Sequence, residues 1–150
     1  MKIINGPQDA LASWLCREIE LVPTANLRCI GMVDDNGVLL GVVGFDGYNG
    51  ASMEMHVAAR SKRWLNRKLL RAAFDYIFNV VGAKVAIGKV AGDNLDALRF
   101  DLKLGFELCA TIPDGHPSGC LHVLMMRREQ CRFLGERYGW EVQSSAAAGS

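Results

Sequence analysis

The Asn36–Gly37 pair, which stands between two apolar runs, constrains the fold more than any other feature of this sequence. Asparagine and glycine both tolerate a positive φ, so the pair between two such runs is a strong signal for a β-hairpin. We therefore predict a strand over residues 28–34, a turn at 35–37 and a second strand over 38–45. Gly41 and Gly44 in the second strand indicate a bulge or a close approach of another segment.

A third strand is predicted over residues 52–58, after a turn at 47–50. The side chains in this segment alternate between apolar and polar, which is typical of a half-buried strand. One face carries Met53, Met55 and Val57. The other face carries Glu54 and His56, so two groups that can accept a proton point to the same side.

The remaining elements follow from apolar periodicity and turn residues. Helices are predicted over 8–20, from Leu65 to residue 81, and from 95 to a C-cap at Gly105, with an optional helix over 129–138. Further strands are predicted over 84–90, 106–112 and 121–126, with a turn at 113–115.

This order of elements predicts a single α/β domain over residues 1–150, with a central twisted mixed β-sheet flanked by helices and a frayed tail from about residue 143. The chain has 150 residues, of which 50% are hydrophobic, and a formal net charge of +1. These values argue against disorder and against a dedicated nucleic-acid binder. No apolar run approaches the length of a membrane span, and we expect no signal peptide.

The five cysteines are widely spaced and form no CxxC motif. We therefore expect no zinc site and no disulfide framework, but reduced thiols in a cytoplasmic protein. The three histidines have no metal-ligand spacing either, so no metal site is expected.

A basic segment joins the third strand to the long helix and contains Arg60, Lys62, Arg63 and Arg67. The N-terminus of a helix presents free N–H groups and the positive end of the helix dipole, which suits a phosphate. A charge run that faces solvent explains the same pattern, because most charge runs do so.

The segment Asn94–Phe106, taken with the order of elements, resembles the GCN5-related N-acetyltransferase superfamily. It is similar to the NxxAxxxYxxxGF pattern of that superfamily at Asn94, Ala97, Gly105 and Phe106. The loop at 113–115 and the segment 126–131 resemble the RimJ/RimL branch of ribosomal-protein acetyltransferases. The resemblance covers about residues 28–134 and implies the fold of this superfamily.

The resemblance also implies an acetyl-CoA site. Its residues would be Val57, Ala58, Lys62, Arg63, Trp64, Leu65, Asn66, Arg67, Asn94, Ala97, Phe100 and Lys103. In the family, glycines in the loop before the long helix allow a close approach of the CoA pyrophosphate, but here Trp64 and Asn66 occupy those positions. Other interpretations stay open: Trp64 as a half-buried anchor, Asn94 as a helix cap and Lys103 as an exposed helical lysine.

Glu54 is the best candidate for a general base, and His56 is the other candidate with a suitable pKa. By the same resemblance, the N–H group near Val57 would polarise the thioester carbonyl. An exposed strand residue and a packed core histidine are the alternatives for Glu54 and His56. The family's tyrosine acid is Asp101 here, and an ionised aspartate is a poor proton donor, so we assign it no such role.

The sequence therefore predicts transfer of an acetyl group from acetyl-CoA to a primary amine of a protein N-terminus, a lysine or a small molecule. No cysteine has an evident activating base, which favours direct attack in a ternary complex. A binding or regulatory module with weakened catalysis is the alternative, favoured by the missing glycines and by Asp101. We expect neither a nucleic-acid nor a membrane partner, and a homodimer is left open.

Overall fold

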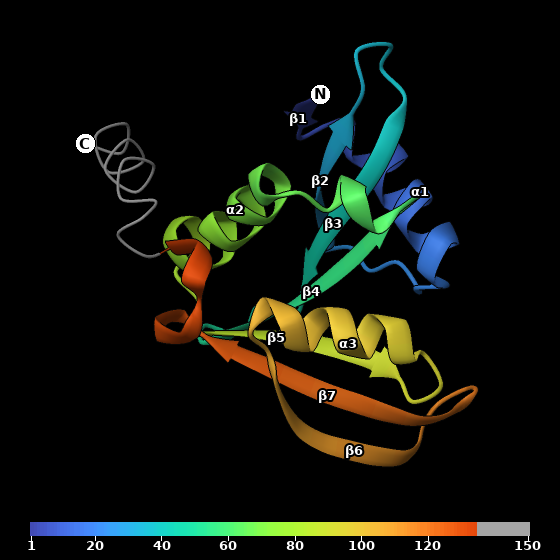
Figure 1. The fold of residues 1–150 in the computed structure, drawn as a ribbon, viewed down its shortest axis with the longest axis vertical. Coiled ribbons are helices and arrows are strands. Elements are labelled where there is room, and N and C mark those ends of the chain that lie inside the picture. Colours follow the sequence, from blue (N-terminus) through green and yellow to red (C-terminus); the bar gives the residue numbers. More distant parts are fainter. Residues whose placement is uncertain (135–150) are drawn as a thin grey trace.

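The computed structural model describes residues 1–134 and contains one mixed seven-stranded sheet in the order β1-β2-β3-β4-β5-β7-β6 (Figure 1). The strands are β1 (Lys2–Ile4), β2 (Arg28–Val33), β3 (Leu39–Asp46), β4 (Ser52–Ala59), β5 (Val85–Ala91), β6 (Glu107–His116) and β7 (Gly119–Arg127). The α-helices are α1 (Gln8–Ile19), α2 (Arg67–Asp75) and α3 (Leu95–Leu104), and α2 continues as a π-helical segment (Tyr76–Val81). This architecture confirms the predicted mixed sheet with flanking helices.

The predicted hairpin is present, because β2 and β3 pair in antiparallel fashion from Arg28↔Phe45 onward. The side chain of Asp34 organises the turn, since its Oδ1 accepts hydrogen bonds from the N–H groups of Asn36 at 2.8 Å and Val38 at 2.9 Å. Gly37 has a φ of 80°, and Asn36 is not among the residues with a positive φ. The turn therefore needs its glycine for backbone conformation and uses Asp34 for hydrogen bonding.

Helix α1 covers one face of β2, β3 and β4. Leu11 and Leu15 are buried there in a small cluster with Cys29, Val42 and Ala58. Gly44 is the close approach predicted from the sequence, because a Cβ atom on it would collide with the side chain of Leu15. A larger side chain on this strand would push α1 away from the sheet.

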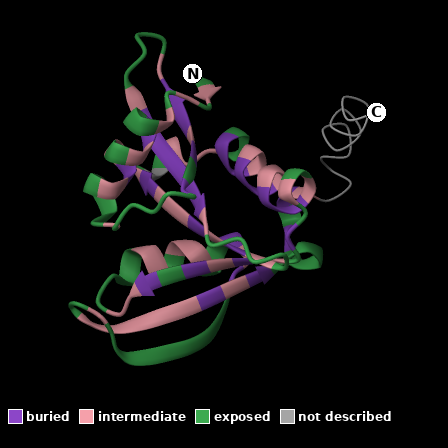
Figure 2. Cartoon of the chain, turned by 180° about the vertical axis from the view of Figure 1, so that it is seen from behind, coloured by how far each residue is buried: buried purple, intermediate pink, exposed green. Residues whose placement is uncertain are grey.

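The larger core lies on the opposite face, under α2 (Figure 2). Phe74 is fully buried, and its ring lies 5.2 Å from that of Phe133 and 6.3 Å from that of Phe106, measured between centroids. The side chains that β4 contributes are Met53, Met55 and the partly buried Val57, as the alternation predicted. The two faces of β4 are therefore distinct, and the Glu54 face is the one that α1 shares.

Strands β4 and β5 run parallel but pair only from Ser52↔Val85 to Glu54↔Ile87. Beyond this point β4 continues to Ala59 and β5 to Ala91 without pairing to each other. Figure 1 shows the two strands diverging from a common start. The sheet is thus split into two halves by an opening between β4 and β5.

Three sequence predictions were wrong in detail. Strand β1 was not predicted; it has only three residues, too few for periodicity to show. The predicted turn at 113–115 lies inside β6, which absorbs it as an irregularity between Ile112 and His116, with Asp114 at a φ of 58°. The long helix begins at Arg67 rather than Leu65, since Asn66 caps it and a separate 3-10 turn (Lys62–Trp64) precedes it.

The segment after β7 does not form the predicted helix where the structure describes it. Residues 128–134 form two 3-10 turns (Arg128–Gln130 and Arg132–Leu134), and the rest of the predicted helix, with the predicted tail, lies outside the described residues. Among residues 1–134, no helix is both long and apolar enough to cross a membrane.

Candidate functional site

The opening between β4 and β5 exposes backbone groups that a regular sheet would pair. The N–H of Arg60 donates to the carbonyl of Leu40 on β3, and the carbonyl of Ala51 accepts from Lys84 and Val85 at the start of β5. Because backbone groups alternate sides along a strand, residues 51, 53, 55 and 57 direct theirs toward β5. The N–H of Val57 lies beyond Glu54, the last residue of β4 that pairs with β5, and so points into the opening.

Ala58 is placed differently from Val57. Its backbone faces β3, where it is the register partner of Val42, and its side chain is buried in the cluster under α1. Of the two neighbouring residues that the sequence put at the cofactor, only Val57 presents its backbone to the opening.

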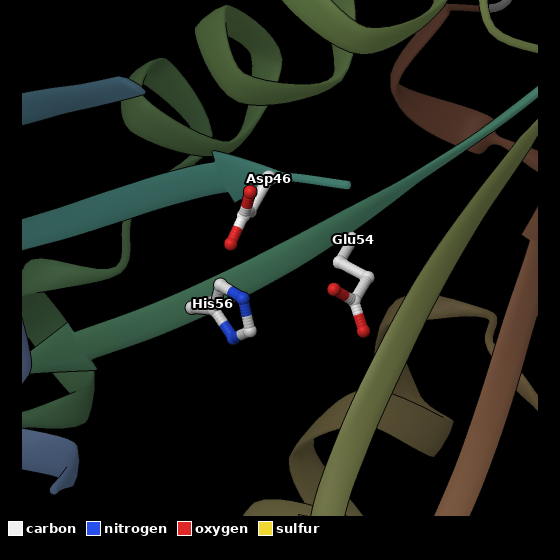
Figure 3. A group of neighbouring side chains, drawn as sticks. All are labelled: Asp46, Glu54 and His56. Carbon is white, nitrogen blue, oxygen red and sulfur yellow. The ribbon is translucent and has the colours of Figure 1, made fainter. Parts of the chain in front are cut away.

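Asp46, Glu54 and His56 form an acidic cluster on the α1 side of the opening (Figure 3). Asp46 is the last residue of β3 and pairs with Glu54, while His56 follows two residues later on the same face of β4. One nitrogen or oxygen atom from each of the three side chains lies within 4.8 Å of the others. The antiparallel register of β3 and β4 therefore brings two carboxylates and an imidazole together.

The carboxylates of this cluster already have partners. Asp46 accepts hydrogen bonds from the Thr24 hydroxyl at 2.8 Å and from the N–H of Gly47 at 2.7 Å. Glu54 forms an ion pair with the ammonium group of Lys89, which projects from β5 across the opening. Three such groups could ligate a cation, but in this arrangement an ammonium group neutralises Glu54. The cluster is chemically suited to positively charged amines.

Burial favours the neutral form of the His56 imidazole. Burial lowers its pKa from the ordinary value of 6.5, and the carboxylates of Glu54 and Asp46 oppose this shift only in part. Its Nε2 atom is shielded from solvent and has no hydrogen-bond partner among the described residues. A neutral imidazole with a free nitrogen can accept a proton or a hydrogen bond from a bound molecule.

Asp101 lies on the other side of β5, on the face that α3 covers. One of its carboxylate oxygens would be 3.3 Å from a Cβ atom built on Gly88. Gly88 follows Ile87, the last residue of β5 that pairs with β4. Burial raises the pKa of Asp101 to about 6. The absence of a side chain at Gly88 leaves room for this carboxyl at the edge of the opening.

The start of α2 is the position of the predicted phosphate site. Asn66 caps the helix, and its side-chain oxygen accepts the N–H of Leu69 at 3.1 Å. This hydrogen bond occupies one of the free donors at this end and leaves the others in the first turn for a ligand.

The basic residues around this helix start are in part open to solvent. The guanidinium of Arg63 lies over the Trp64 ring at 4.6 Å from its centroid. Arg67 is exposed in the first turn, and Leu65 is partly buried against the core. The side chain of Lys62, also predicted at the cofactor, lies outside the described part of the structure.

The α3 residues named from the sequence occupy three different environments. Asn94 caps the helix by accepting the N–H of Ala97 at 3.2 Å, as its alternative interpretation predicted. Ala97 and Phe100 pack against the core, whereas Lys103 is exposed. The carbonyl of Lys103 accepts a hydrogen bond from Arg132 at 2.7 Å.

The sequence did not predict two residues at this site. These are Asp46, which belongs to the acidic cluster, and Lys89, which forms the ion pair with Glu54. Asp46 ends a strand, and its relation to Glu54 depends on the β3–β4 register. Lys89 reaches Glu54 only because β4 and β5 are parallel neighbours. Neither relation has a local signal in the sequence.

An open depression of about 750 Å³ lies next to this site, between α1 and residues 23–28. Thr24 belongs to its lining and also donates to Asp46. The segment 23–28 therefore leads to the acidic cluster.

No protein-family model and no curated protein match this sequence. Solved structures do match the fold. A mutant form of the spermidine N-acetyltransferase from Vibrio cholerae has a TM-score of 0.73 at 14% identity, over 91% of this chain and 99% of its own. The Vibrio cholerae enzyme in complex with CoA and spermine has a TM-score of 0.68 at 14% identity, over 89% of this chain and 98% of its own.

A third structure, of the spermidine/spermine N-acetyltransferase from Vibrio cholerae with manganese ions, has a TM-score of 0.61 at 19% identity, over 79% of this chain and 74% of its own. These similarities show that the chain has the fold of the GCN5-related N-acetyltransferases. They do not bear on the RimJ/RimL branch, which stays a prediction.

Proposed function

We propose that this protein is an N-acetyltransferase that moves an acetyl group from acetyl-CoA to a primary amine of a small cationic molecule. The observation that carries the proposal is the opening between β4 and β5, with a backbone donor inside it and the acidic cluster on its α1 side. The neighbour that contains CoA and spermine supports both halves of the reaction.

The donor would bind from the side of α2 and α3. Exposed Arg63 and Arg67 at the start of α2 supply positive charge for the pyrophosphate, and the uncapped N–H groups of the first turn supply hydrogen bonds. The acetyl end would then lie in the opening, with the thioester oxygen against the N–H of Val57. A pre-positioned donor at that point stabilises the negative charge that develops on the oxygen.

The acceptor would bind from the α1 side. Asp46 and Glu54 attract an ammonium group. This attraction favours small amines with more than one positive charge over an amine in a peptide, where the neighbouring backbone carries no charge. Polyamines have this chemistry. A protein N-terminus or a lysine side chain is the wider class that the sequence left open, and a comparison of acceptors decides between them.

The reaction needs an unprotonated amine, because an ammonium group has no lone pair. Glu54 would take the proton, directly or through water, with the neutral imidazole of His56 as a second acceptor beside it. The amine nitrogen then attacks the thioester carbon, the C–S bond breaks, and CoA leaves as a thiolate that takes up a proton. This is direct attack in a ternary complex, without an acyl-enzyme.

The test is to incubate the protein with acetyl-CoA and one acceptor at a time, and to measure the acetylated product by mass spectrometry. Spermidine, spermine, a lysine peptide and a peptide with a free N-terminus form the set. We expect the polyamines to give the highest kcat/KM. Higher activity on either peptide would overturn the small-amine assignment, and no product with any acceptor would overturn the enzymatic one.

A binding module is the second candidate, and a specific observation favours it. Trp64 and Asn66 replace the glycines of the phosphate loop, and Asn66 occupies the Leu69 N–H with its own side chain. Binding of acetyl-CoA without turnover on any acceptor is the result that this alternative predicts.

A further inference from the structure

We propose that Lys89 is a site of self-acetylation: the protein transfers an acetyl group from its own bound acetyl-CoA to the Nζ atom of this lysine. The inference rests on the proposed function for its acetyl donor, and it adds a covalent modification site on the chain itself. The ion pair between Lys89 and Glu54, located at the opening of the sheet, is the observation behind it.

The position of Lys89 in the sheet directs its side chain to the opening. Lys89 lies on β5 two residues beyond Ile87, where pairing with β4 ends, and alternation puts both residues on the same face. Ile87 is the register partner of Glu54, so the Lys89 side chain emerges on the Glu54 side of the opening. The backbone of Lys89 lies about 7 Å along the strand from that of Ile87, at a rise of roughly 3.3 Å per residue.

The ion pair brings the amine to the candidate base. Acetyl transfer requires a primary amine, a base in contact with it and an activated carbonyl nearby. Lys89 supplies a primary amine that already contacts Glu54. The Val57 N–H, three residues beyond Glu54 on β4, points into the same opening. An external amine acceptor would have to occupy this position, so Lys89 is a tethered equivalent of the substrate.

The Lys89 side chain is able to move within the opening. It is 46% exposed and Glu54 is 22% exposed, so no packed core holds the amine in place. A lysine has a flexible four-carbon stem and a compact ammonium group, which allows its nitrogen to move from the carboxylate toward a bound thioester. A tethered reactant also avoids the entropic cost of bringing two molecules together.

The chemical step is balanced without any further reagent. Glu54 takes one proton from the Lys89 ammonium, and the neutral nitrogen attacks the thioester carbon. The N–C amide bond forms, the C–S bond breaks, and the CoA thiolate leaves and is protonated. The products are Nε-acetyl-Lys89, CoA and one released proton, and no electrons are exchanged with an outside donor.

The modification would change the acceptor site. Lys89 neutralises one of the two carboxylates of the acidic cluster. Acetylation removes its positive charge, so Glu54 becomes free for the ammonium group of an external amine.

The experiment is to incubate the purified protein with acetyl-CoA and no acceptor, and to follow each lysine by peptide mass spectrometry. Lys84 is the matched control, because it is exposed and lies just before β5, five residues from Lys89 and on the paired side of the opening. We expect Lys89 to be acetylated at least 10-fold faster than Lys84, at a first-order rate that is independent of protein concentration. Glu54→Gln should slow Lys89 acetylation about 100-fold and leave Lys84 unchanged.

Equal acetylation of Lys84 and Lys89 would overturn the inference, because it would indicate uncatalysed chemistry on exposed amines. A rate that rises with protein concentration would also overturn it, since transfer would then occur between molecules. A calorimetric titration with acetyl-CoA and turnover of spermidine are measured in parallel. If both succeed while Lys89 stays unmodified, only the self-acetylation fails; if acetyl-CoA does not bind, the proposed function fails and this inference fails with it.

Discussion

Glu54→Gln is the substitution that best separates catalysis from stability at this site. The change keeps the shape of the side chain and removes its charge, so the ion pair with Lys89 becomes an ordinary hydrogen bond. The partners are 46% and 22% exposed, and ion pairs with this degree of exposure contribute about 0.2–1 kcal/mol to folding. We therefore expect the free energy of unfolding to fall by about 1 kcal/mol at most.

The catalytic effect of the same substitution should be much larger. A positioned general base accelerates proton transfer by about 10²–10⁴-fold, which corresponds to roughly 3–6 kcal/mol of activation free energy. We expect kcat/KM for spermidine to fall by at least 100-fold at pH 7. The deficit should shrink as the pH rises toward the pKa of the acceptor amine, near 10, because a growing fraction of the amine is then already neutral.

The assay is the rate of CoA release between pH 6 and 10, with urea unfolding of the same preparations. Glu18→Gln is the control, since Glu18 is an exposed glutamate on α1 outside the site. A loss below twofold at all pH values would refute the role of Glu54 as the base. A loss of several kcal/mol of stability would show instead that Glu54 is mainly a structural residue.

Three further predictions concern the site's surroundings. Asp101→Asn should stabilise the protein more at pH 8 than at pH 4. Its effect on the free energy of unfolding should be larger at pH 8 by up to about 3 kcal/mol, as measured by urea unfolding at both pH values. The sign follows from the raised pKa: the folded state binds the proton more tightly, so stability falls as the pH rises from 3.8 through about 6 and stays lower above it. Asn66→Ala should lower the free energy of unfolding by about 1 kcal/mol through loss of the α2 cap, whereas Asn66→Gly should cost only a few tenths; equal losses in urea unfolding would contradict the capping argument. Phe74→Ala should lower the free energy of unfolding by about 3–5 kcal/mol, because Phe74 is fully buried among three other phenylalanine rings. A loss below about 1 kcal/mol would show that the core collapses to fill the cavity.

The sequence predicted the elements that have strong local signals. The β2–β3 hairpin follows from Asn36 and Gly37, and the inner face of β4 follows from its alternating side chains. Gly82 and Gly105 end helical segments with a positive φ, as glycine caps should. Each of these features depends on a few consecutive residues and their own backbone preferences.

Features that depend on distant residues were harder to predict. Strand β1 exists because Lys2–Ile4 pair with β2, and the paired residues are 27 to 31 positions apart in the sequence. The turn residues at 113–115 were absorbed into β6, since pairing with β7 continues on both sides of them. Tertiary pairing overrides local turn preference in this strand.

The candidate site shows the same division. Glu54, His56 and Val57 could be predicted as candidates because one strand carries all three, and their alternation assigns them to faces. Asp46 and Lys89 could not be predicted as their neighbours, because only the strand register places them beside Glu54. The raised pKa of Asp101 could not be predicted from the sequence either, because it depends on burial of the carboxyl between α3 and the sheet.

The most direct test is a calorimetric titration of the protein with acetyl-CoA, with acetylated pantetheine as the matched ligand that lacks the nucleotide. We expect saturable binding of acetyl-CoA at one site, at least 10-fold weaker binding of the pantetheine compound, and weaker acetyl-CoA binding by Arg67→Ser. Absence of acetyl-CoA binding at millimolar concentration would contradict the assignment of the opening between β4 and β5 as an acyl-CoA site.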